Sequence, residues 1–230
     1  IKEFKTTRDH TENMLKSMGY NIKIKESSKH RFIKMRNDKD LKTIDYNVPG
    51  DPSSAAFFIT AACLKPGSKL VIKKMLFNKT RIGFIKTLKN MGGNIKVIRK
   101  KKIHNELIAD LQIEQTKNLN STILKPDDIP LQVDEIPILS IAASFANGLT
   151  VFKGLKELTV KESNRLLLIH ENLKKIGVKC PNPEGRPQCD WLIVDTGTII
   201  VHLFRKEIRE LYNLEKLWEV NFHSSEIKLA

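Results

Sequence analysis

The chain repeats one helix-to-strand pattern three times, and such a repeat limits the possible folds more than any other feature of the sequence. The copies read "TTRDHTENMLKSMGYNIKI" from Thr6, "KTRIGFIKTLKNMGGNIKV" from Lys79 and "KESNRLLLIHENLKKIGVKC" from Lys161. Each predicts a helix that closes with Leu-Lys-x-Met/Ile-Gly, followed by an alternating apolar strand. The closing glycine is the usual residue for the left-handed turn that ends a helix.

Two of these copies are preceded by a second matching block. It reads "VPGDPSSAAFFITAACLKPGSKLVIKKM" from Val48 and "VDEIPILSIAASFANGLTVFKGL" from Val133. Each block predicts an Ala-rich helix, a turn at Gly67 or Gly148, and a β-branched strand. The full unit is a short strand, a helix, a strand, a second helix and a second strand, which indicates an α/β (α+β) fold built of quasi-symmetric copies.

Both ends of the chain depart from the repeat. The chain opens on the second half of a unit, so we expect the Ala-rich half to have been removed or never to have existed. After about Asp195 we expect neither a Gly-terminated helix nor a matching strand. A frameshift just after Leu203 would explain that loss of pattern.

Composition narrows the possible classes of function. The formal net charge of +14 and the pI near 9.7 admit nucleic acids, membrane surfaces and small anionic ligands. The lysines are scattered, aromatic residues make up only 7%, and no recognition-helix or zinc-finger spacing occurs, so nucleic-acid binding is disfavoured. The cysteines, Cys63, Cys180 and Cys189, lack a metal-type spacing and are interpreted as structural thiols.

No membrane segment is expected. The longest apolar-looking stretch, "IPLQVDEIPILSIAASFANGLTVF", is interrupted by Gln132, Asp134, Glu135 and Asn147. The first residues lack the apolar centre of a signal peptide. A cytoplasmic protein is therefore the expectation.

An arginine stands near the start of each repeated helix: Arg8, Arg81 and Arg165. Helix N-termini are already positive, and here cations are added to them. If equivalent helices face one cleft, their N-termini and guanidinium groups would together bind phosphate or carboxylate. The repeat therefore predicts an anion site.

Simpler interpretations stay open for the charged residues near the starts of these helices. Asp134 and Glu135 could cap the helix that follows, with Pro137 in its first turn. Lys161, Glu162 and Arg165 could be no more than a charged first turn.

The serines of the second block also have two interpretations. Ser53 and Ser54 could cap their own helix, or they could add hydroxyl donors to the anion site.

The segments "TRDHTENML", "VPGDPSSAAFF", "DEIPILSIAASFANG" and "VKESNR" resemble the enolpyruvyl transferase family, in particular its branch that acts on shikimate 3-phosphate. The similarity runs from about Thr6 to Val178. It implies two lobes, each with three βαβαββ units in pseudo-threefold symmetry and with helix N-termini aimed at the cleft. On this basis residues 1–46 would end the first lobe, residues 47–195 would form two units of the second lobe, and residues 196–230 would be a divergent tail.

The resemblance also implies a reaction. Enolpyruvyl is transferred from phosphoenolpyruvate to the 5-hydroxyl of shikimate 3-phosphate, with release of phosphate and without a metal or organic cofactor. The implied partners are these two small molecules, with no nucleic acid and no membrane. Full activity would require an N-terminal lobe that this chain lacks.

Individual roles follow from the matching motifs. Asp134 resembles the proton acceptor, and Glu162 resembles the group that protonates the methylene carbon and later removes that proton. Lys161 and Arg8 are similar to ligands of shikimate 3-phosphate, and Arg165 is similar to the fork that holds phosphoenolpyruvate.

The sequence departs from the family at two places. Asn164 replaces the aspartate usual in Lys-Glu-Ser-Asp-Arg, and no Asp-His-Arg motif follows His202.

Other functions remain as alternatives. One is a UDP-N-acetylglucosamine enolpyruvyl transferase of the same fold. Another is a degenerate, non-catalytic binding or scaffold protein.

Overall fold

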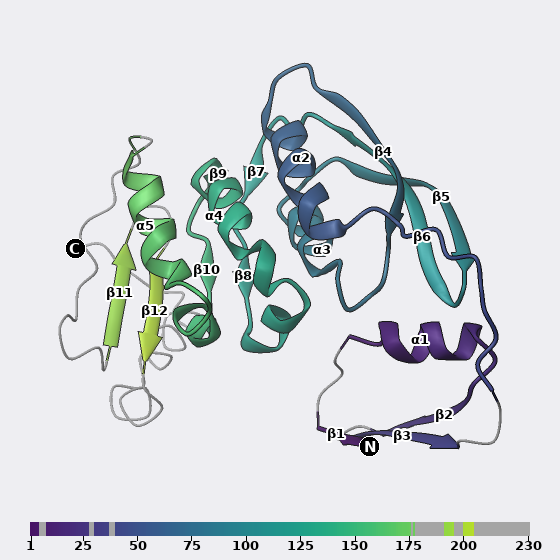
Figure 1. Ribbon diagram of the computed structural model, residues 1–230. Coiled ribbons are helices and arrows are strands. Elements are labelled where there is room, and N and C mark those ends of the chain that lie inside the picture. The colour runs from purple at the N-terminus through teal and green to yellow at the C-terminus, as the bar shows by residue number, and fades with distance from the viewer. Residues whose placement is uncertain are drawn as a thin grey trace, which may run out of the picture.

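The computed structural model describes residues 1–4, 8–27, 30–36, 40–175 and 177, together with the backbone of 191–195 and 200–204. The N-terminal segment contains β1 (Lys2–Glu3), α1 (His10–Ser17), β2 (Asn21–Glu26) and β3 (Arg31–Arg36). Its strands form an antiparallel sheet in the order β1-β3-β2, and α1 lies along one face of this sheet (Figure 1).

A buried arginine holds this small segment together. Only 5% of the Arg31 side chain is exposed, and its Nη1 lies 3.0 Å from Glu3 Oε2 and 2.8 Å from Glu12 Oε1. Burial alone would lower the pKa of Arg31, but the hydrogen bonds and charges of Glu3 and Glu12 outweigh it and raise this pKa. The ion pairs therefore fasten α1 and β1 to β3.

The next unit contains two helices and a twisted three-stranded sheet. It contains α2 (Pro52–Leu64), β4 (Lys69–Leu76), α3 (Gly83–Asn90), β5 (Ile95–Ile103) and β6 (Glu106–Glu114). The antiparallel sheet has the order β4-β6-β5. Gly50 forms a parallel bridge with Met75, which supplies the short strand expected before α2.

The following unit uses shorter strands and several 3₁₀ turns. Its elements are β7 (Leu119–Asn120), β8 (Ile123–Leu124), η1 (Pro126–Leu131), η2 (Val133–Glu135), α4 (Ile136–Ser144), β9 (Ala146–Asn147), β10 (Val151–Phe152), η3 (Leu155–Thr159), α5 (Arg165–Lys175), β11 (Trp191–Asp195) and β12 (Ile200–Phe204). The β8–β10 and β7–β9 pairs are parallel, and β11 pairs with β12 in antiparallel register.

The two units repeat the same order of elements, as the sequence predicts. In each, a short strand pairs in parallel with the strand after the first helix, and a second helix and two antiparallel strands follow. The helix-closing residues Gly19, Gly92 and Gly177 have φ of +88°, +95° and +84°, the predicted left-handed conformation. The expected strand immediately after Gly177 lies outside the described residues.

One expectation about the tail is wrong. Residues 196–230 were expected to contain no matching strand, yet Ile200–Phe204 forms β12 and pairs along its whole length with β11. β12 begins with the β-branched residues Ile200 and Val201, and such residues favour strands. The tail from residue 205 onward lies outside the described residues.

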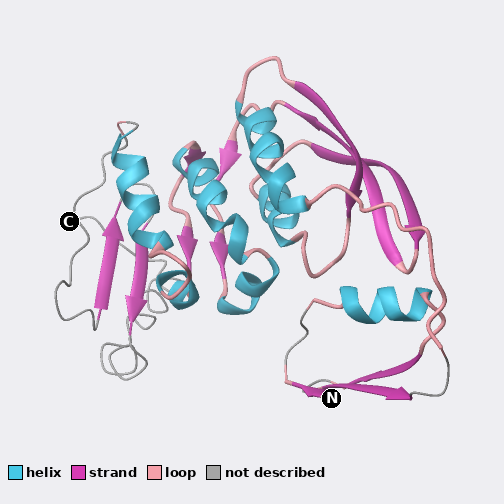
Figure 2. Cartoon of the chain, in the orientation of Figure 1, coloured by secondary structure: helices cyan, strands magenta, loops and turns pink. Residues whose placement is uncertain are grey.

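The core lies between the helices of the two units. Helices α2, α3 and α4 contact one another, and the β4-β6-β5 sheet lies along one side of α2 (Figure 2). Fully buried side chains on α2 and α4 are small or branched and allow close packing: Ala56, Ile59, Cys63, Leu139, Ala142 and Ala143.

Cys63 belongs to this core. Its burial raises the pKa of the thiol to about 11, although a hydrogen bond with Thr116 works in the opposite direction. A thiol with this pKa stays protonated at neutral pH, which supports the interpretation of Cys63 as a packing residue. Cys180 and Cys189 lie outside the described residues.

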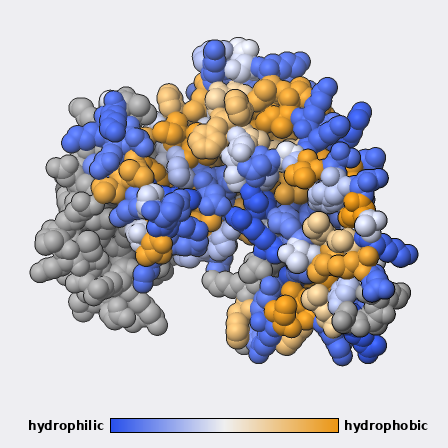
Figure 3. Space-filling model, in the orientation of Figure 1, coloured by the Kyte–Doolittle hydropathy of each residue, from blue (hydrophilic) through white to orange (hydrophobic). Residues whose placement is uncertain are grey.

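Hydrophilic residues gather in the middle of the face shown in Figure 3, where the surface is hollowed beside the N-terminal segment. Among the residues that the structure describes, none of the helices has the length and apolar character needed to cross a membrane.

The start of α3 packs closely against the turn that leads to Asp134. A Cβ atom added at Gly83 would lie 2.8 Å from the Leu131 carbonyl oxygen and 2.9 Å from Leu131 Cβ. We therefore expect Gly83→Ala to lower the free energy of unfolding by about 1–3 kcal/mol, because the added methyl overpacks this contact. Urea unfolding followed by circular dichroism measures the change.

Gly50→Ala is the matched control. Its nearest neighbours would be the Lys74 carbonyl oxygen and Met75 Cα, both at an ordinary 3.7 Å, so the loss should stay within about 0.5 kcal/mol. Equal losses in the two variants would contradict the close approach at Leu131.

Candidate active site

Three distant segments meet at the carboxylate of Asp134. Asp134 lies in η2, directly before α4, and its side chain is 32% exposed. Its Oδ2 accepts a hydrogen bond from Arg8 Nη2 at 2.9 Å, and its Oδ1 accepts one from Arg165 Nη1 at 3.0 Å. Arg8 stands two residues before α1, and Arg165 is the first residue of α5. The structure therefore brings together three of the residues that the sequence singled out.

Glu162 joins this group through Arg165. Its Oε1 lies 2.6 Å from Arg165 Nη2 and 3.2 Å from Arg165 Nε, while its side chain remains 69% exposed. The sequence places Glu162 in the first turn of a helix, and this is wrong, because α5 begins at Arg165 and residues 160–163 form a bend. Asn164 Oδ1 accepts from the Leu167 amide at 3.2 Å and so caps the start of α5.

Lys161 lies beside the group without bonding to Asp134. Its Nζ is 2.6 Å from Glu157 Oε1 in η3. The Lys161 side chain is 27% exposed, and its charge helps to lower the pKa of Glu162.

The arginines control the ionisation of both carboxylates. Burial would raise the pKa of Asp134, but hydrogen bonds and charge from Arg8 and Arg165 outweigh burial and hold it below its ordinary value. The hydrogen bond from Arg165 is the main cause of the lowered pKa of Glu162, and the charge of Lys161 adds to it. Both carboxylates are therefore ionised at neutral pH and keep the arginine forks in place.

The capping interpretation of Asp134 and Glu135 is wrong. Glu135 is the N-cap residue of α4 by position, yet neither carboxylate makes a side-chain capping hydrogen bond there. Glu135 is 3% exposed and its Oε1 lies 2.5 Å from Ser53 Oγ. Burial, and then the charge of Asp134, raise the pKa of Glu135 despite the hydrogen bond from Ser53.

The third repeat arginine has a separate carboxylate partner. Arg81 Nη2 lies 2.9 Å from both Asp51 Oδ1 and Ser53 Oγ. The serines do not cap α2, because Asp51 Oδ2 accepts from the amide and hydroxyl of Ser54. Sequence reasoning missed Asp51 as the carboxylate partner of Arg81.

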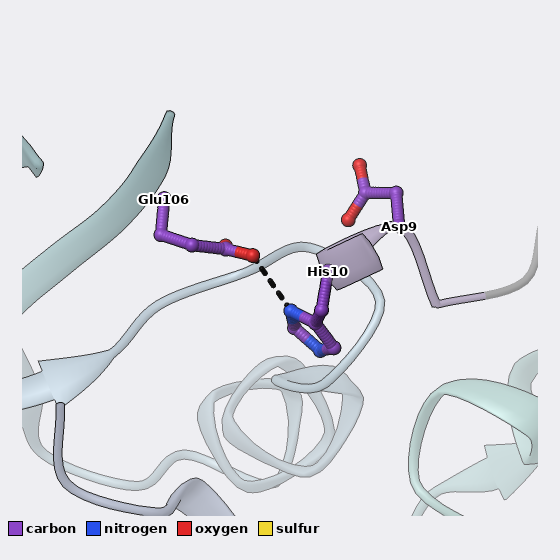
Figure 4. A group of neighbouring side chains, drawn as sticks. All are labelled: Asp9, His10 and Glu106. Carbon is purple, nitrogen blue, oxygen red and sulfur yellow. Dashed lines mark hydrogen bonds and ion pairs between the residues drawn. The ribbon is translucent and has the colours of Figure 1, made fainter. Parts of the chain in front are cut away.

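A further cluster of potential metal ligands consists of Asp9, His10 and Glu106 (Figure 4). Its carboxylate oxygens already accept hydrogen bonds. Asn78 Nδ2 donates to Asp9 Oδ1 at 2.6 Å and to Glu106 Oε2 at 3.1 Å. The other Glu106 oxygen, Oε1, lies 2.7 Å from His10 Nδ1. These contacts suit a hydrogen-bonded anchor better than a cation site.

The arrangement at Asp134 can bind anions and move protons. Two guanidinium groups offer planar pairs of donors to phosphate or carboxylate. Two carboxylates beside them can exchange a proton with a bound hydroxyl or carbon atom.

Comparisons with known proteins agree with this chemistry. The family model described as EPSP synthase (3-phosphoshikimate 1-carboxyvinyltransferase) matches residues 1–202. The 3-phosphoshikimate 1-carboxyvinyltransferase of Persephonella marina is 44% identical over 78% of this chain and 41% of its own length. That of Zymomonas mobilis is 40% identical over 82% of this chain and 40% of its own length.

A solved structure supports the fold as well. EPSP synthase from Acinetobacter baumannii matches 77% of this chain and 39% of its own chain, with a TM-score of 0.71 and 38% sequence identity. The chain thus spans about two fifths of the length of the relatives it matches. With the α/β architecture and the family match over residues 1–202, the chain belongs to the EPSP synthase (3-phosphoshikimate 1-carboxyvinyltransferase) family.

Proposed function

We propose that this chain forms part of an active site that transfers the enolpyruvyl group of phosphoenolpyruvate to the 5-hydroxyl of shikimate 3-phosphate. A bond forms between the 5-oxygen and C2 of phosphoenolpyruvate, and the bond from C2 to the phosphate oxygen breaks. Because the matched relatives are longer, the remaining part of the site is supplied by sequence that this chain does not cover. The names of the relatives support this reaction.

The proposed roles are those that the family resemblance implies for these residues. Asp134 accepts the proton of the attacking hydroxyl, and Glu162 protonates the methylene carbon and then removes that proton. Lys161 and Arg8 bind shikimate 3-phosphate, and Arg165 binds phosphoenolpyruvate. Exposure of Glu162 and the planar forks of the two arginines support these assignments.

One observation carries the proposal: Arg8 and Arg165 both donate to Asp134. A carboxylate held by two cations is a weak base. The phosphate and carboxylate groups of the substrates compete for the same guanidinium groups. As the arginines turn to the substrates, the pKa of Asp134 rises and the carboxylate becomes a better proton acceptor. The pKa of Glu162 rises in the same way when Arg165 leaves it, so Glu162 takes up from solvent the proton that it then gives to the methylene carbon.

The division of the chain is part of the proposal. Residues 1–46 end one lobe, and residues 47–195 together with β12 belong to the other. A cytoplasmic location, the lack of cofactors and the absence of nucleic-acid partners remain predictions.

The alternatives make different predictions. A UDP-N-acetylglucosamine enolpyruvyl transferase would bind the UDP-sugar in preference to shikimate 3-phosphate, which calorimetric titration distinguishes. A degenerate scaffold would release no phosphate. The names of the matched relatives favour the shikimate branch.

Replacing either proposed proton carrier should slow turnover. The test protein is the Persephonella marina relative in which residues 1–202 of this chain replace the matching segment. We expect Asp134→Asn and Glu162→Gln each to lower kcat about 10²–10⁴-fold, because each removes one proton-transfer group. A coupled phosphate-release assay measures kcat.

Asp127→Asn and Glu171→Gln are the controls. Both residues are exposed, and these substitutions make the same carboxylate-to-amide change elsewhere on the surface. Turnover that survives in Asp134→Asn and Glu162→Gln as well as in the controls would exclude the proposed roles.

Substrate binding should raise the pKa of Asp134. In the free protein this pKa lies below its ordinary value because Arg8 and Arg165 favour the ionised form. Shikimate 3-phosphate draws Arg8 away, so the titration midpoint moves to higher pH. Carbon NMR of the Asp134 carboxyl, assigned with Asp134→Asn in the same hybrid protein, measures the midpoint.

Shikimate without its phosphate is the control ligand, and it should give a smaller rise. A midpoint that falls or stays constant with shikimate 3-phosphate would contradict the competition for Arg8.

A further inference from the structure

The contact between Arg8 and Asp134 requires the N-terminal segment to be held against the rest of the chain. Arg8 is 48% exposed and makes a hydrogen bond to Asp134 from the start of α1. One exposed ion pair contributes little to stability, about 0–1 kcal/mol. Other contacts must therefore hold the start of α1 near the site.

Glu106 provides the most buried of these contacts. It is the first residue of β6 and is 3% exposed. Its Oε1 lies 2.7 Å from His10 Nδ1 and accepts from Asn13 Nδ2 at 3.2 Å. Both partners belong to α1, within five residues of Arg8. Figure 4 shows Glu106 reaching from its strand toward the first turn of this helix.

Asn78 makes the anchor rigid. Its Nδ2 donates to Glu106 Oε2 at 3.1 Å and to Asp9 Oδ1 at 2.6 Å. Its own Oδ1 accepts from the amide and hydroxyl of Thr80. The amide plane is therefore fixed from both sides, and it holds the residue that directly follows Arg8.

The turn that joins β5 to β6, next to Glu106, also contacts the N-terminal segment. Asn105 Nδ2 donates to Ser17 Oγ at 2.9 Å, and the rings of Tyr46 and His104 lie 5.4 Å apart. Burial, and then the charge of Glu106, raise the pKa of Tyr46. The β-hairpin formed by β5 and β6 thus contacts both ends of α1.

We propose that Glu106 is a positioning residue, which anchors His10 and Asn13 so that the Arg8 guanidinium reaches Asp134. A carboxylate suits this place because it accepts from three side chains at once. Replacing it with an amide sets an NH₂ group against the donors of Asn78 or Asn13. The start of α1 then shifts, and Arg8 leaves Asp134. The functional consequence rests on the proposed role of Arg8 in binding substrate.

The test measures the titration midpoint of the Asp134 carboxyl in the ligand-free 230-residue chain by carbon NMR. We expect Glu106→Gln to move the midpoint to higher pH by about as much as Arg8→Ala does. The double variant should show no further rise, because both changes act through Arg8. Loss of the Glu106 charge alone would lower the midpoint, since it removes a nearby negative charge. The sign therefore separates positioning from long-range electrostatics.

Glu114→Gln is the matched control at the other end of β6. Glu114 also accepts from two side-chain amides, those of Asn94 and Gln112, but it has no described contact with α1. Its variant should leave the Asp134 midpoint unchanged. Glu106→Asp keeps the charge and withdraws the carboxylate by one methylene, so it should give a smaller rise and serves if Glu106→Gln fails to fold.

An unchanged or lowered midpoint in the Glu106 variants overturns the proposal, as does a rise that persists in the Arg8→Ala background. If Arg8→Ala itself does not raise the midpoint, Arg8 is not held at Asp134 and the proposal also fails. None of these outcomes depends on catalysis. Failure of the proposed function appears separately, as absence of phosphate release by the hybrid protein.

Discussion

The shared carboxylate of Asp134 is the point at which the separate parts of the chain become one site. Arg8 and Arg165 come from segments more than a hundred residues apart, and each donates to a different oxygen of the same group. Two guanidinium groups so close together repel each other unless an anion lies between them. In the free protein Asp134 is that anion, and the proposed substrates bring others.

The repeat explains why arginines gather here. Each copy places a guanidinium at or just before the start of a helix, where the backbone amides add positive potential. Arg8 and Arg165 use this position to reach Asp134, whereas Arg81 pairs with Asp51 and Ser53. One structural unit, used several times, therefore supplies similar charges that different neighbours direct to different partners.

Buried polar contacts place the parts with the accuracy that such a site needs. Arg31 fastens α1 to its sheet, and Glu106 with Asn78 fastens the start of α1 to the β-hairpin. A buried carboxylate without donors would be costly, so the arrangement that satisfies Glu106 is strongly favoured over alternatives. The exposed ion pair at Asp134 then needs little energy of its own and remains free to exchange partners.

The sequence by itself determined the features that depend on local pattern. Helix-closing glycines such as Gly92, the Ala-rich helices, and the arginines near the helix starts all follow from periodicity and capping. The family resemblance directed attention to Asp134 and Arg165. These signals are readable because each depends on residues within a few turns of one another.

Only the tertiary structure decided which charged groups meet. It assigned Asp134 to two arginines rather than to a helix cap, began α5 at Arg165, and brought Glu106 into contact with α1. It also added strand β12 beyond the expected end of the repeat. Such pairings depend on how whole elements pack in three dimensions, and no local period or spacing in the sequence encodes that arrangement.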